Sequence, residues 1–544
     1  MEKNMVENLS KDVLVLDVLC DGNGFAAVPF DLAGQEGAVV YVDWHDGGEG
    51  NLEELNEKSS SMKCIHRYAE PKTMHRIEVF SPDWSKVCIC GVDSDYEPRA
   101  IYPQQSFAGI MARCHWHLKS PLPPLKGTAV VEIAEAGQAA FEWKPDIREG
   151  TMDSAMTLFY QIEELPEDLF SKNLAASFNW TFARCLFNCP IPSGLFKNQT
   201  EAESFASCFR HCVFSGDFPE WIFQDCSKAQ NFHKVFAHSN LASVPEGMFY
   251  GCAEARNYGG AFSDTRIKEL PKTRLFSHSP LAECFESCFY GCDSLKSAPD
   301  GLFSGTSAAS FYMCFAHCRK LESIGDIFAH CGSAESFNLC FSGCEKLSTV
   351  PSNLFLTCDE ARTFHKCFEN CTSLTSIGYD FFKGVSKTAE DFSFAFQGCT
   401  GITRIPDKLF EGCFSAETFA GTFEDCRSLE IIPGNVFKDC PNAKSFERTF
   451  AKCSSVHTVG VNLFSWAKWT ENFCECFDGC ASLVDASLRI DAEHVNDAEG
   501  FYPLRLKSRR DEILSVCVPA NSKTYASFRD AQPAKGWQIE RYSR

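Results

Sequence analysis

The sequence has no excess of positive charge and no long apolar run. Its 544 residues carry 51 Lys and Arg against 72 Asp and Glu, which gives a formal net charge of −21. Nucleic acids and anionic membrane surfaces attract clustered Lys and Arg, so we expect neither as the main partner. No stretch approaches the roughly 18 consecutive apolar residues of a membrane-spanning helix, so we expect no membrane insertion.

Recognisable catalytic motifs are also absent. The sequence has no Gly-x-Ser-x-Gly, no phosphate-binding loop, no His-Glu-x-x-His and no calcium-loop pattern. We therefore expect no enzyme activity, no cofactor, and no catalytic, cofactor-binding or metal-binding residue. The stretch from Met1 to Asp17 lacks the apolar core and small-residue cleavage site of a signal peptide. Either the protein is not exported by that route, or the sequence begins after a removed signal.

Phenylalanine and cysteine are abundant, with 49 Phe and 31 Cys. Both counts come from an internal repeat with steps of 26 to 28 residues, in which a Phe stands three residues before a Cys or its substitute. Another aromatic residue stands four residues before that Phe in each of twelve units. These first aromatics are Phe178, Phe205, Phe232, Tyr258, Phe285, Phe311, Phe337, Phe364, Phe392, Phe419, Phe446 and Phe473. Such a period indicates stacked supersecondary units, so we predict a solenoid of about twelve coils.

The unit at residues 345–371 illustrates the expected local structure. Residues 347–350 form a short extended piece, and Pro351 turns the chain out of it. From Ala361 to Phe368, apolar residues fall at i, i+3, i+6 and i+7, which predicts a helix of two to three turns. We therefore predict an α/β repeat, a right-handed solenoid with a parallel β-ladder on one side, helices on the other and stacked Phe side chains inside.

The cysteines are odd in number, and most follow the repeat among Phe and Ala. We expect mostly reduced, buried thiols that pack as small hydrophobic residues. Some disulfides are the alternative, because dense cysteine in secreted domains usually forms them. A zinc array is disfavoured, because the usual spacing is that of Cys340 and Cys344 and no His pair recurs with it.

Several segments carry a family resemblance. "SLTSIGYDFFKG", "KLSTVPSNLFLTC" and "GITRIPDKLFEGC", with the ending FxxCFxxC, resemble leucine-rich repeats of the BspA type and a related bacterial surface-protein repeat. The resemblance covers about residues 150 to 485 and implies a leucine-rich-repeat-like solenoid. It also implies an extracellular or cell-surface adhesion protein with an unidentified protein or glycan ligand.

The N-terminal part is similar to the PKD-type β-sandwich. The similarity lies in "VVYVDWHDGGEG" (residues 39–50) and "HRYAEPKTMHRIEVF" (residues 66–80). The positions that match the family pattern are Trp44, Asp46, Gly47, His66 and Tyr68, whereas His45 replaces a Gly. Alternating apolar residues at 13–19 and 76–80 predict strands independently. PKD-like modules before such repeats fit surface proteins of gut bacteria or their phages.

The expected organisation has four parts. Residues 1–103 are a PKD-like β-sandwich, 104–157 a transition and N-terminal cap, 158–485 the leucine-rich-repeat-like solenoid, and 486–544 a C-terminal capping segment. Residues 513–542 resemble the closing segment of such repeat proteins, with a strand, a short helix and a final strand at Trp537. Caps with a polar outer face are expected at the ends of a solenoid.

Several clusters could carry chemistry, but each has a simpler structural interpretation. Cys114-His-Trp-His117 has metal-ligand residue types but no partner cluster. Adjacent residues on a helix do not face each other, so the recurring His-Cys pairs are disfavoured as nucleophiles. These pairs begin at His211, His317 and His330.

Three further features have structural interpretations or carry little weight. Asp43 and Asp46 are expected to fix a turn rather than to bind calcium, and Asn179 and Asn198 are only formal glycosylation acceptors. A specific site is best sought in the N-terminal module's loops or in the irregular coils that lose the repeat Cys. Those coils contain Ser239, Gly259, Gly260 and Thr265.

Three functions fit this sequence. The first is a non-enzymatic binding or adhesion protein that uses the solenoid surface. The second is a structural component of a phage virion or extracellular assembly, which the absent signal peptide favours. The third is an intracellular scaffold or injected effector, which reduced cysteines would suit. The negative charge predicts that an electrostatic partner is a basic protein surface, and otherwise a neutral glycan.

Overall fold

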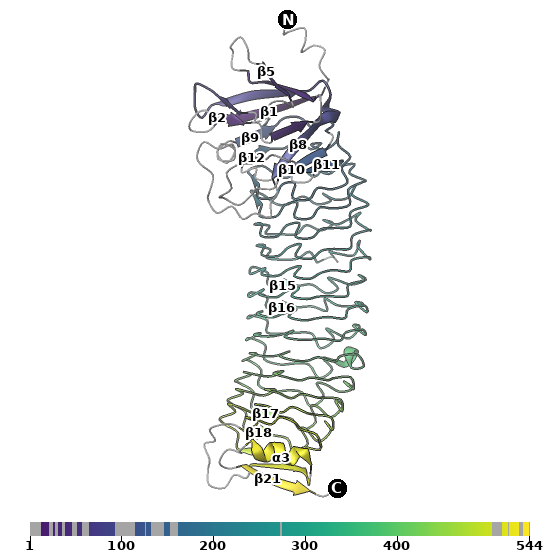
Figure 1. Cartoon of the computed structure of the whole chain (residues 1–544), viewed down its shortest axis with the longest axis vertical. Helices are drawn as coiled ribbons and strands as arrows, with labels where there is room; N and C mark the ends of the chain where they lie inside the picture. Colours follow the sequence, from purple (N-terminus) through teal and green to yellow (C-terminus); the bar gives the residue numbers. More distant parts are fainter. Residues whose placement is uncertain are drawn as a thin grey trace. The chain divides into compact units, whose positions relative to one another are not determined.

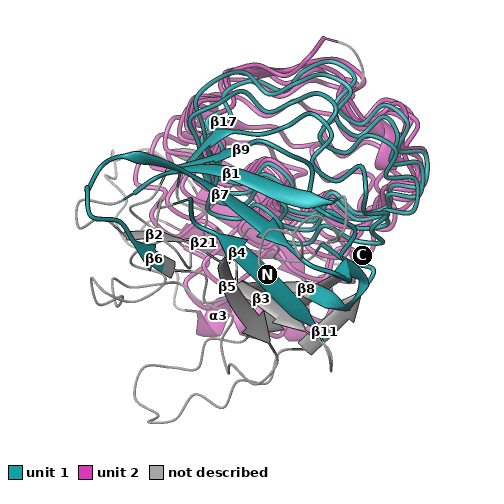
Figure 2. Ribbon diagram, turned by 90° about the horizontal axis from the view of Figure 1, so that it is seen from above, with its two compact units in different colours: residues 1–266 teal, residues 267–544 magenta. Residues whose placement is uncertain are grey.

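The computed structural model describes residues 12–20, 25–27, 31–34, 38–45, 52–56, 65–92, 115–125, 127–131, 146–152, 161–272, 275–502, 514–520, 522–531 and 537–542. The chain divides into two compact units, unit 1 at residues 1–266 and unit 2 at residues 267–544, coloured separately in Figure 2. The repeat runs through both units, and in each of them it forms a stack of coils.

Unit 1 contains two larger β-sheets and one strand pair. One sheet has the order β14-β13-β12-β9-β1-β7-β4-β5, the other has the order β11-β10-β8-β3, and β2 pairs with β6. The elements are β1 (Val13–Leu19), β2 (Phe25–Ala27), β3 (Asp31–Gly34), β4 (Val39–Asp43), β5 (Leu52–Asn56), β6 (Ile65–Arg67), β7 (Met74–Phe80), η1 (Trp84–Lys86), β8 (Val87–Val92), β9 (His115–Leu118), β10 (Gly127–Val131), β11 (Asp146–Glu149), β12 (Ile162–Glu164), β13 (Leu186–Phe187) and β14 (Val213–Phe214).

The two strands predicted near the N-terminus are confirmed as β1 and β7. They pair antiparallel with Val13 opposite Phe80, and alternate residues of β1 are buried because every second side chain faces the core. Strand β9 comes from the predicted transition and pairs with both β1 and β12. The N-terminal strands and the start of the repeat therefore share one sheet. Packing of the sheets as a sandwich stays a prediction.

Residues that carry the PKD-like resemblance lie against one another. The rings of Trp44 and His66 stack with centroids 5.1 Å apart, and the Tyr68 hydroxyl donates a hydrogen bond to the Trp44 carbonyl at 2.8 Å. Trp44 and Tyr68 are both buried. These contacts give the matching positions a common structural role, which is to hold the end of β4 against the segment after β6.

Unit 2 continues the repeat and ends in a larger parallel sheet. Its elements are β15 (Ser297–Ala298), β16 (Ser323–Ile324), η2 (Lys383–Val385), β17 (Ile431–Ile432), β18 (Thr458–Val459), β19 (Asp485–Arg489), β20 (Leu514–Pro519), α3 (Lys523–Asp530) and β21 (Trp537–Tyr542). Strands β17 to β21 form one parallel sheet in sequence order, which Figure 1 shows at the C-terminal end together with α3. The predicted strand, short helix and final strand of this cap are confirmed.

The coils are joined by short parallel pairings, as predicted for one side of the solenoid. Most are two-residue strands or single bridges, such as that of Ser323 with Thr349 in the predicted extended piece. Bridges also join the half of the coil where a helix was predicted, as those of Thr363 with Ser336 and with Asp391 do. Seen from above in Figure 2, the coils of unit 2 follow nearly the same outline. The repeat is thus a β-solenoid, whereas the right-handed, leucine-rich-repeat-like assignment stays a prediction.

The helix predicted in the second half of each coil is wrong. In the coil that contains Phe364, its N–H donates to the Asp391 carbonyl of the next coil, and the N–H of Phe368 donates to Ala395, both at 2.8 Å. The N–H of Cys367 instead reaches back three residues to the Phe364 carbonyl at 3.0 Å. Alternate N–H groups therefore join coils and the others close tight turns. Successive four-residue turns place apolar side chains at positions i and i+4, as a helix does. The spacing of apolar residues therefore could not distinguish these turns from a helix.

Left-handed backbone conformations produce these turns. In all twelve coils the residues two and six positions after the first aromatic have positive φ, for example Lys366 (56°) and Asn370 (57°) after Phe364. Glycine adopts this conformation freely, whereas other residues lose roughly 1–2 kcal/mol. At Gly343 (73°) a Cβ atom would also lie 2.7 Å from Nδ1 of His317. The hydrogen bonds between coils hold the backbone in this conformation.

The predicted Phe ladder is confirmed within each unit. Equivalent rings of neighbouring coils stack, with centroids 5.4 Å apart for Phe337 and Phe364 and 5.2 Å apart for Phe341 and Phe368. A third column from the Leu-Phe pairs inserts between them, as Phe355 does edge-on at 4.8 Å from Phe337. These five side chains are fully buried. Each coil therefore completes its core with aromatic rings of its neighbours.

Among the cysteines whose side chains the structure describes, none forms a disulfide, and all but Cys284, Cys474 and Cys517 are buried. In addition to the predicted packing, the repeat thiols donate hydrogen bonds. The thiol of Cys344 donates to the Phe315 carbonyl of the preceding coil at 3.1 Å, and equivalent bonds recur along the repeat. A small apolar side chain that also donates one weak hydrogen bond explains why Cys occupies this position.

Candidate binding groove

The sequence-derived metal candidate is not assembled in the described residues. Cys114 lies outside them, Trp116 of β9 is buried, and His117 Nδ1 lies 3.4 Å from a Glu164 carboxylate oxygen. The described part of the chain has no group of three or more His, Cys, Asp or Glu side chains that could hold a metal ion.

The structure describes one of the two candidate calcium ligands. An Asp43 carboxylate oxygen accepts the backbone N–H of His45 at 2.9 Å, and Asp46 lies outside the described residues. His45 has positive φ, 47°, at the position where the PKD pattern has a Gly. Asp43 therefore stabilises the turn after β4, as predicted.

The His-Cys pairs do not form nucleophilic sites. The Cys212 thiol is buried and donates to the Phe182 carbonyl at 2.9 Å, whereas the His211 ring stacks on His238 with centroids 4.6 Å apart. Burial raises the pKa of the Cys212 thiol far above its ordinary value. Because the thiolate is the nucleophilic form, a thiol in this setting is unreactive.

The irregular coils carry structural substitutions at the repeat Cys position. Ser239 and Thr265 are buried, and the Thr265 hydroxyl donates to the Phe262 carbonyl of its own coil at 2.8 Å. Gly260 takes a left-handed φ of 62°. The two glycosylation candidates differ, because the Asn179 amide oxygen accepts from Ser204 Oγ at 2.6 Å whereas Asn198 is exposed.

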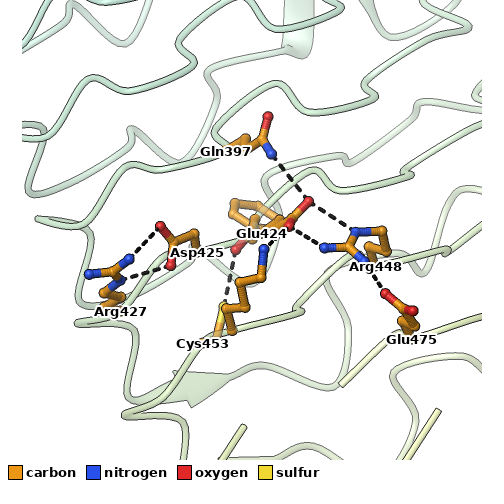
Figure 3. A network of polar contacts seen from close by, with 9 residues as sticks. Gln397, Glu424, Asp425, Arg427, Arg448, Cys453 and Glu475 are labelled. Atoms are coloured by element: carbon orange, nitrogen blue, oxygen red, sulfur yellow. Dashed lines mark hydrogen bonds and ion pairs between the residues drawn. The ribbon is translucent and has the colours of Figure 1, made fainter. Parts of the chain in front are cut away.

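A buried ionic cluster in unit 2 is satisfied internally (Figure 3). Glu424 is 3% exposed and accepts bonds from Arg448, from Lys452 Nζ at 2.9 Å and from Gln397 Nε2 at 3.2 Å. Burial opposes its ionisation, but the hydrogen bonds from the two cations outweigh this, so the pKa of Glu424 lies below its ordinary value. A carboxylate held ionised by partners on adjacent coils cross-links the stack and is a poor general acid.

An open groove lies on the surface of unit 1 between successive coils. It has a volume of about 270 Å³ and is lined by residues of equivalent turns, among them Glu167, Gly194, Lys197, Trp221 and Asp225. Such residues are about 27 positions apart in sequence, and stacking of the coils brings them side by side. The groove is therefore formed jointly by neighbouring coils of unit 1.

Trp221 is the unusual residue of this groove. Its φ is 60°, a left-handed value that bulky side chains rarely take, and its side chain is 42% exposed. One coil and three coils further along, the equivalent position holds glycine in that conformation, with Gly247 at 76° and Gly301 at 66°. Strain at a position where the repeat accepts glycine is a reason to suspect function.

The neighbouring side chains hold the Trp221 ring in place. A Cβ atom on Gly247 would lie 3.3 Å from the ring, so the glycine of the following coil leaves room for one face. Tyr250 contacts the ring edge-to-face with centroids 4.8 Å apart, and it is itself 44% exposed. Ser193, Gly194 and the other groove residues of the preceding coils lie on the opposite side. Trp221 is thus held by Gly247 and Tyr250 while it lines the groove.

The groove is acidic. Glu167, Glu220 and Asp225 supply three carboxylates against the single amine of Lys197. Glu220 accepts a hydrogen bond from the indole Nε1 of Trp221 at 3.1 Å, and Asp225 accepts the backbone N–H of Asn198 at 3.0 Å. An exposed aromatic face beside carboxylates is suited to a cationic group, since the ring and the carboxylates both attract positive charge.

The sequence analysis did not find this groove. A signal was present, because the Leu-Phe-like pairs align Trp221 with Gly194, Gly247 and Gly301. A large aromatic residue at a position that three other coils fill with glycine marks an exposed position that the core does not require. Recognising it required the positive φ values of Trp221, Gly247 and Gly301, which the spacing of apolar residues does not reveal.

Comparisons with known proteins identify no family. No family model matches the chain, and no curated protein matches it. Among solved structures, a chain of the Drosophila Toll–Spatzle complex is similar with a TM-score of 0.27 and 12% identity. The match covers 71% of this chain and 58% of that chain, so this chain spans less than two thirds of its length. Separately, none of the helices among the described residues is long and apolar enough to cross a membrane.

Proposed function

We propose that this chain is a non-catalytic binding protein that holds a basic segment of a partner protein in the groove beside Trp221. The observation that carries the proposal is the exposed, left-handed Trp221 between acidic side chains. Trp and Tyr are frequent anchors of protein interfaces because they bury much area at little entropic cost. A cell-surface location and an adhesion role agree with the resemblance to surface-protein repeats.

Charge favours a protein over a neutral glycan as the partner. The chain has a net charge of −21, and the groove adds three carboxylates around one amine. A Lys or Arg side chain placed over the indole would gain a cation–π contact worth about 0.5–2 kcal/mol, and the carboxylates would add to it. Long-range attraction would also speed the encounter with a basic surface.

The test uses the full chain and a short Arg-rich peptide as the probe. Trp221→Gly removes the ring and relieves the left-handed backbone, so the variant is expected to fold at least as well as the parent. Loss of the cation–π contact should weaken peptide binding by about 2- to 30-fold, measured by calorimetry at low salt. Trp469→Ala is the matched control, because Trp469 is 63% exposed and belongs to unit 2.

Each outcome decides between partners. Peptide binding that weakens with Trp221→Gly and with added salt, but not with Trp469→Ala, supports the proposal. Binding of an uncharged oligosaccharide that depends on Trp221 and is insensitive to salt would replace the basic segment with a glycan. Equal affinity of the parent and the Trp221→Gly variant for the peptide would refute the groove as a binding site.

A further inference from the structure

A basic patch lies on unit 1, although the chain is strongly acidic. It is formed by Arg184, Arg210 and Lys234, which come from three successive coils. Three imidazoles accompany them, those of His211, His233 and His238. In these coils and the next, the left-handed turn positions carry one acidic side chain, that of Asp264, which lies 3.4 Å from His238. This "basic patch" is defined by these six cationic or titratable side chains.

Backbone and ring contacts bring the basic patch together. The backbone N–H of Arg184 donates to the Arg210 carbonyl at 2.8 Å, so the two arginines stand on adjacent coils. The rings of His211 and His238 are parallel to within 8° and have centroids 4.6 Å apart. The Arg210 guanidinium covers the Trp180 ring at 5.1 Å, and Nε of Arg184 is buried without a hydrogen-bond partner.

The surrounding positive charges affect the pKa values of two partly buried imidazoles, those of His211 and His233. Burial, together with the positive charges of His238, Arg210 and Arg184, lowers the pKa of His211 to about 4. Burial also lowers the pKa of His233, with Lys234 and Arg210 acting in the same direction. No carboxylate offsets these effects at either ring. An anion placed here would be attracted by several cations at once.

We infer that the basic patch binds the sulfate groups of a sulfated glycan chain. Guanidinium and ammonium groups on three successive coils, which stack at about 4.8 Å, fit a linear polyanion better than a single ion. Arginine forks suit tetrahedral oxyanions, and the buried Nε of Arg184 gives one donor in need of an acceptor. Nucleic acid fits less well, because Arg210 already covers the Trp180 ring on which a base would stack.

The binding test compares matched charge losses in the full chain. The probe is a sulfated heparin-type octasaccharide, and affinity is measured at fixed ionic strength. We expect the triple variant Arg184→Gln, Arg210→Gln, Lys234→Gln to bind at least roughly tenfold more weakly. Lys234→Gln alone, which leaves Arg210 on Trp180, should weaken binding about threefold. Lys228→Gln is the control, because Lys228 pairs with Glu201 outside the basic patch.

Further probes distinguish the sources of the anion. The desulfated octasaccharide and inorganic sulfate should both bind far more weakly than the sulfated chain. Tighter binding of a DNA duplex, equal binding of the desulfated sugar, or an equal loss in Lys228→Gln would each overturn the inference.

A nuclear magnetic resonance titration gives an independent readout. Bound sulfate should raise the pKa of His211 from about 4, and affinity should increase as the pH falls toward that value. The groups that face this ring are His238, Arg210 and Arg184, with Asp264 beyond His238. A His211 pKa that is unchanged at saturating octasaccharide would overturn the inference, whatever the affinities of the variants.

Discussion

Removing one ring from the centre of the Phe ladder should destabilise several coils of unit 2. Phe341 is fully buried, with ring centroids 5.6 Å from Phe315 and 5.2 Å from Phe368. It also meets Phe328 edge-on at 6.2 Å. We therefore expect Phe341→Ala to leave a cavity that touches three coils and that backbone hydrogen bonds on both sides prevent from collapsing.

The magnitude follows from two terms. Large-to-small changes at a buried Phe cost about 3–5 kcal/mol, and the cost is highest where the surroundings cannot relax. The two stacked pairs contribute about 0.5–1.5 kcal/mol each within that total. We expect a loss of about 4–5 kcal/mol for Phe341→Ala. Phe414→Ala is the matched control, because Phe414 is 56% exposed in the same unit and should change stability by less than about 0.5 kcal/mol.

Hydrogen exchange is the suitable assay, because a long repeat array does not unfold as a single two-state unit. A loss of 4 kcal/mol should speed exchange about a thousandfold at the amides of residues 311–371. Coils near Phe450 and Phe477 should be little affected, because each repeat contacts only its neighbours. Exchange within threefold of the parent in residues 311–371, or an equal effect from Phe414→Ala, would refute the assigned core.

Three further predictions concern the backbone and the thiols. Gly343→Ala should lower the free energy of unfolding by more than about 1 kcal/mol, because its φ is 73° and the new Cβ would meet His317. The same exchange assay measures this loss, and an unchanged exchange rate would contradict the left-handed turn. Most cysteines should resist labelling in the native protein and react in denaturant, and blocked thiols without reductant would indicate disulfides instead. Burial raises the pKa of the Cys399 thiol to about 12 from 9.0, so above pH 9 only the unfolded chain ionises there. Stability should be complete below pH 9 and fall by up to about 1.4 kcal/mol per pH unit for each such thiol, and a flat melting temperature from pH 8 to 11 would contradict the burial.

The core could be predicted from the sequence because identical positions recur in every coil. Phe337 and Phe341 hold their spacing through twelve units, and only a shared interior explains that constancy. The cap was predictable for a similar reason, since the strand at 514–519, the helix and the strand at Trp537 are regular elements with ordinary patterns.

The conformation between those core positions could not be predicted from apolar spacing. Side chains at Phe364 and Phe368 lie four residues apart in a helix and equally in two successive tight turns. The discriminating signal was the residue type six positions after the first aromatic, where Gly291, Gly343 and Gly398 stand. Glycine at the same position of several units contradicts a helix interior and indicates positive φ.

Both proposed sites occupy positions where the fold itself would be most stable with glycine. Trp221 has a φ of 60°, and in the basic patch Arg184, His211 and Lys234 have φ values of 68°, 59° and 53°. Among the eight coils of unit 2, the position six residues after the first aromatic holds glycine four times. The four coils of unit 1 hold Arg, His, His and Asp there, and none holds glycine. Each of these side chains costs roughly 1–2 kcal/mol of backbone strain relative to glycine, and neither core packing nor a turn requires it. The solenoid uses its Phe and Cys for packing, so selection for binding can act on the turns, and in unit 1 large or charged residues stand at all four of these positions.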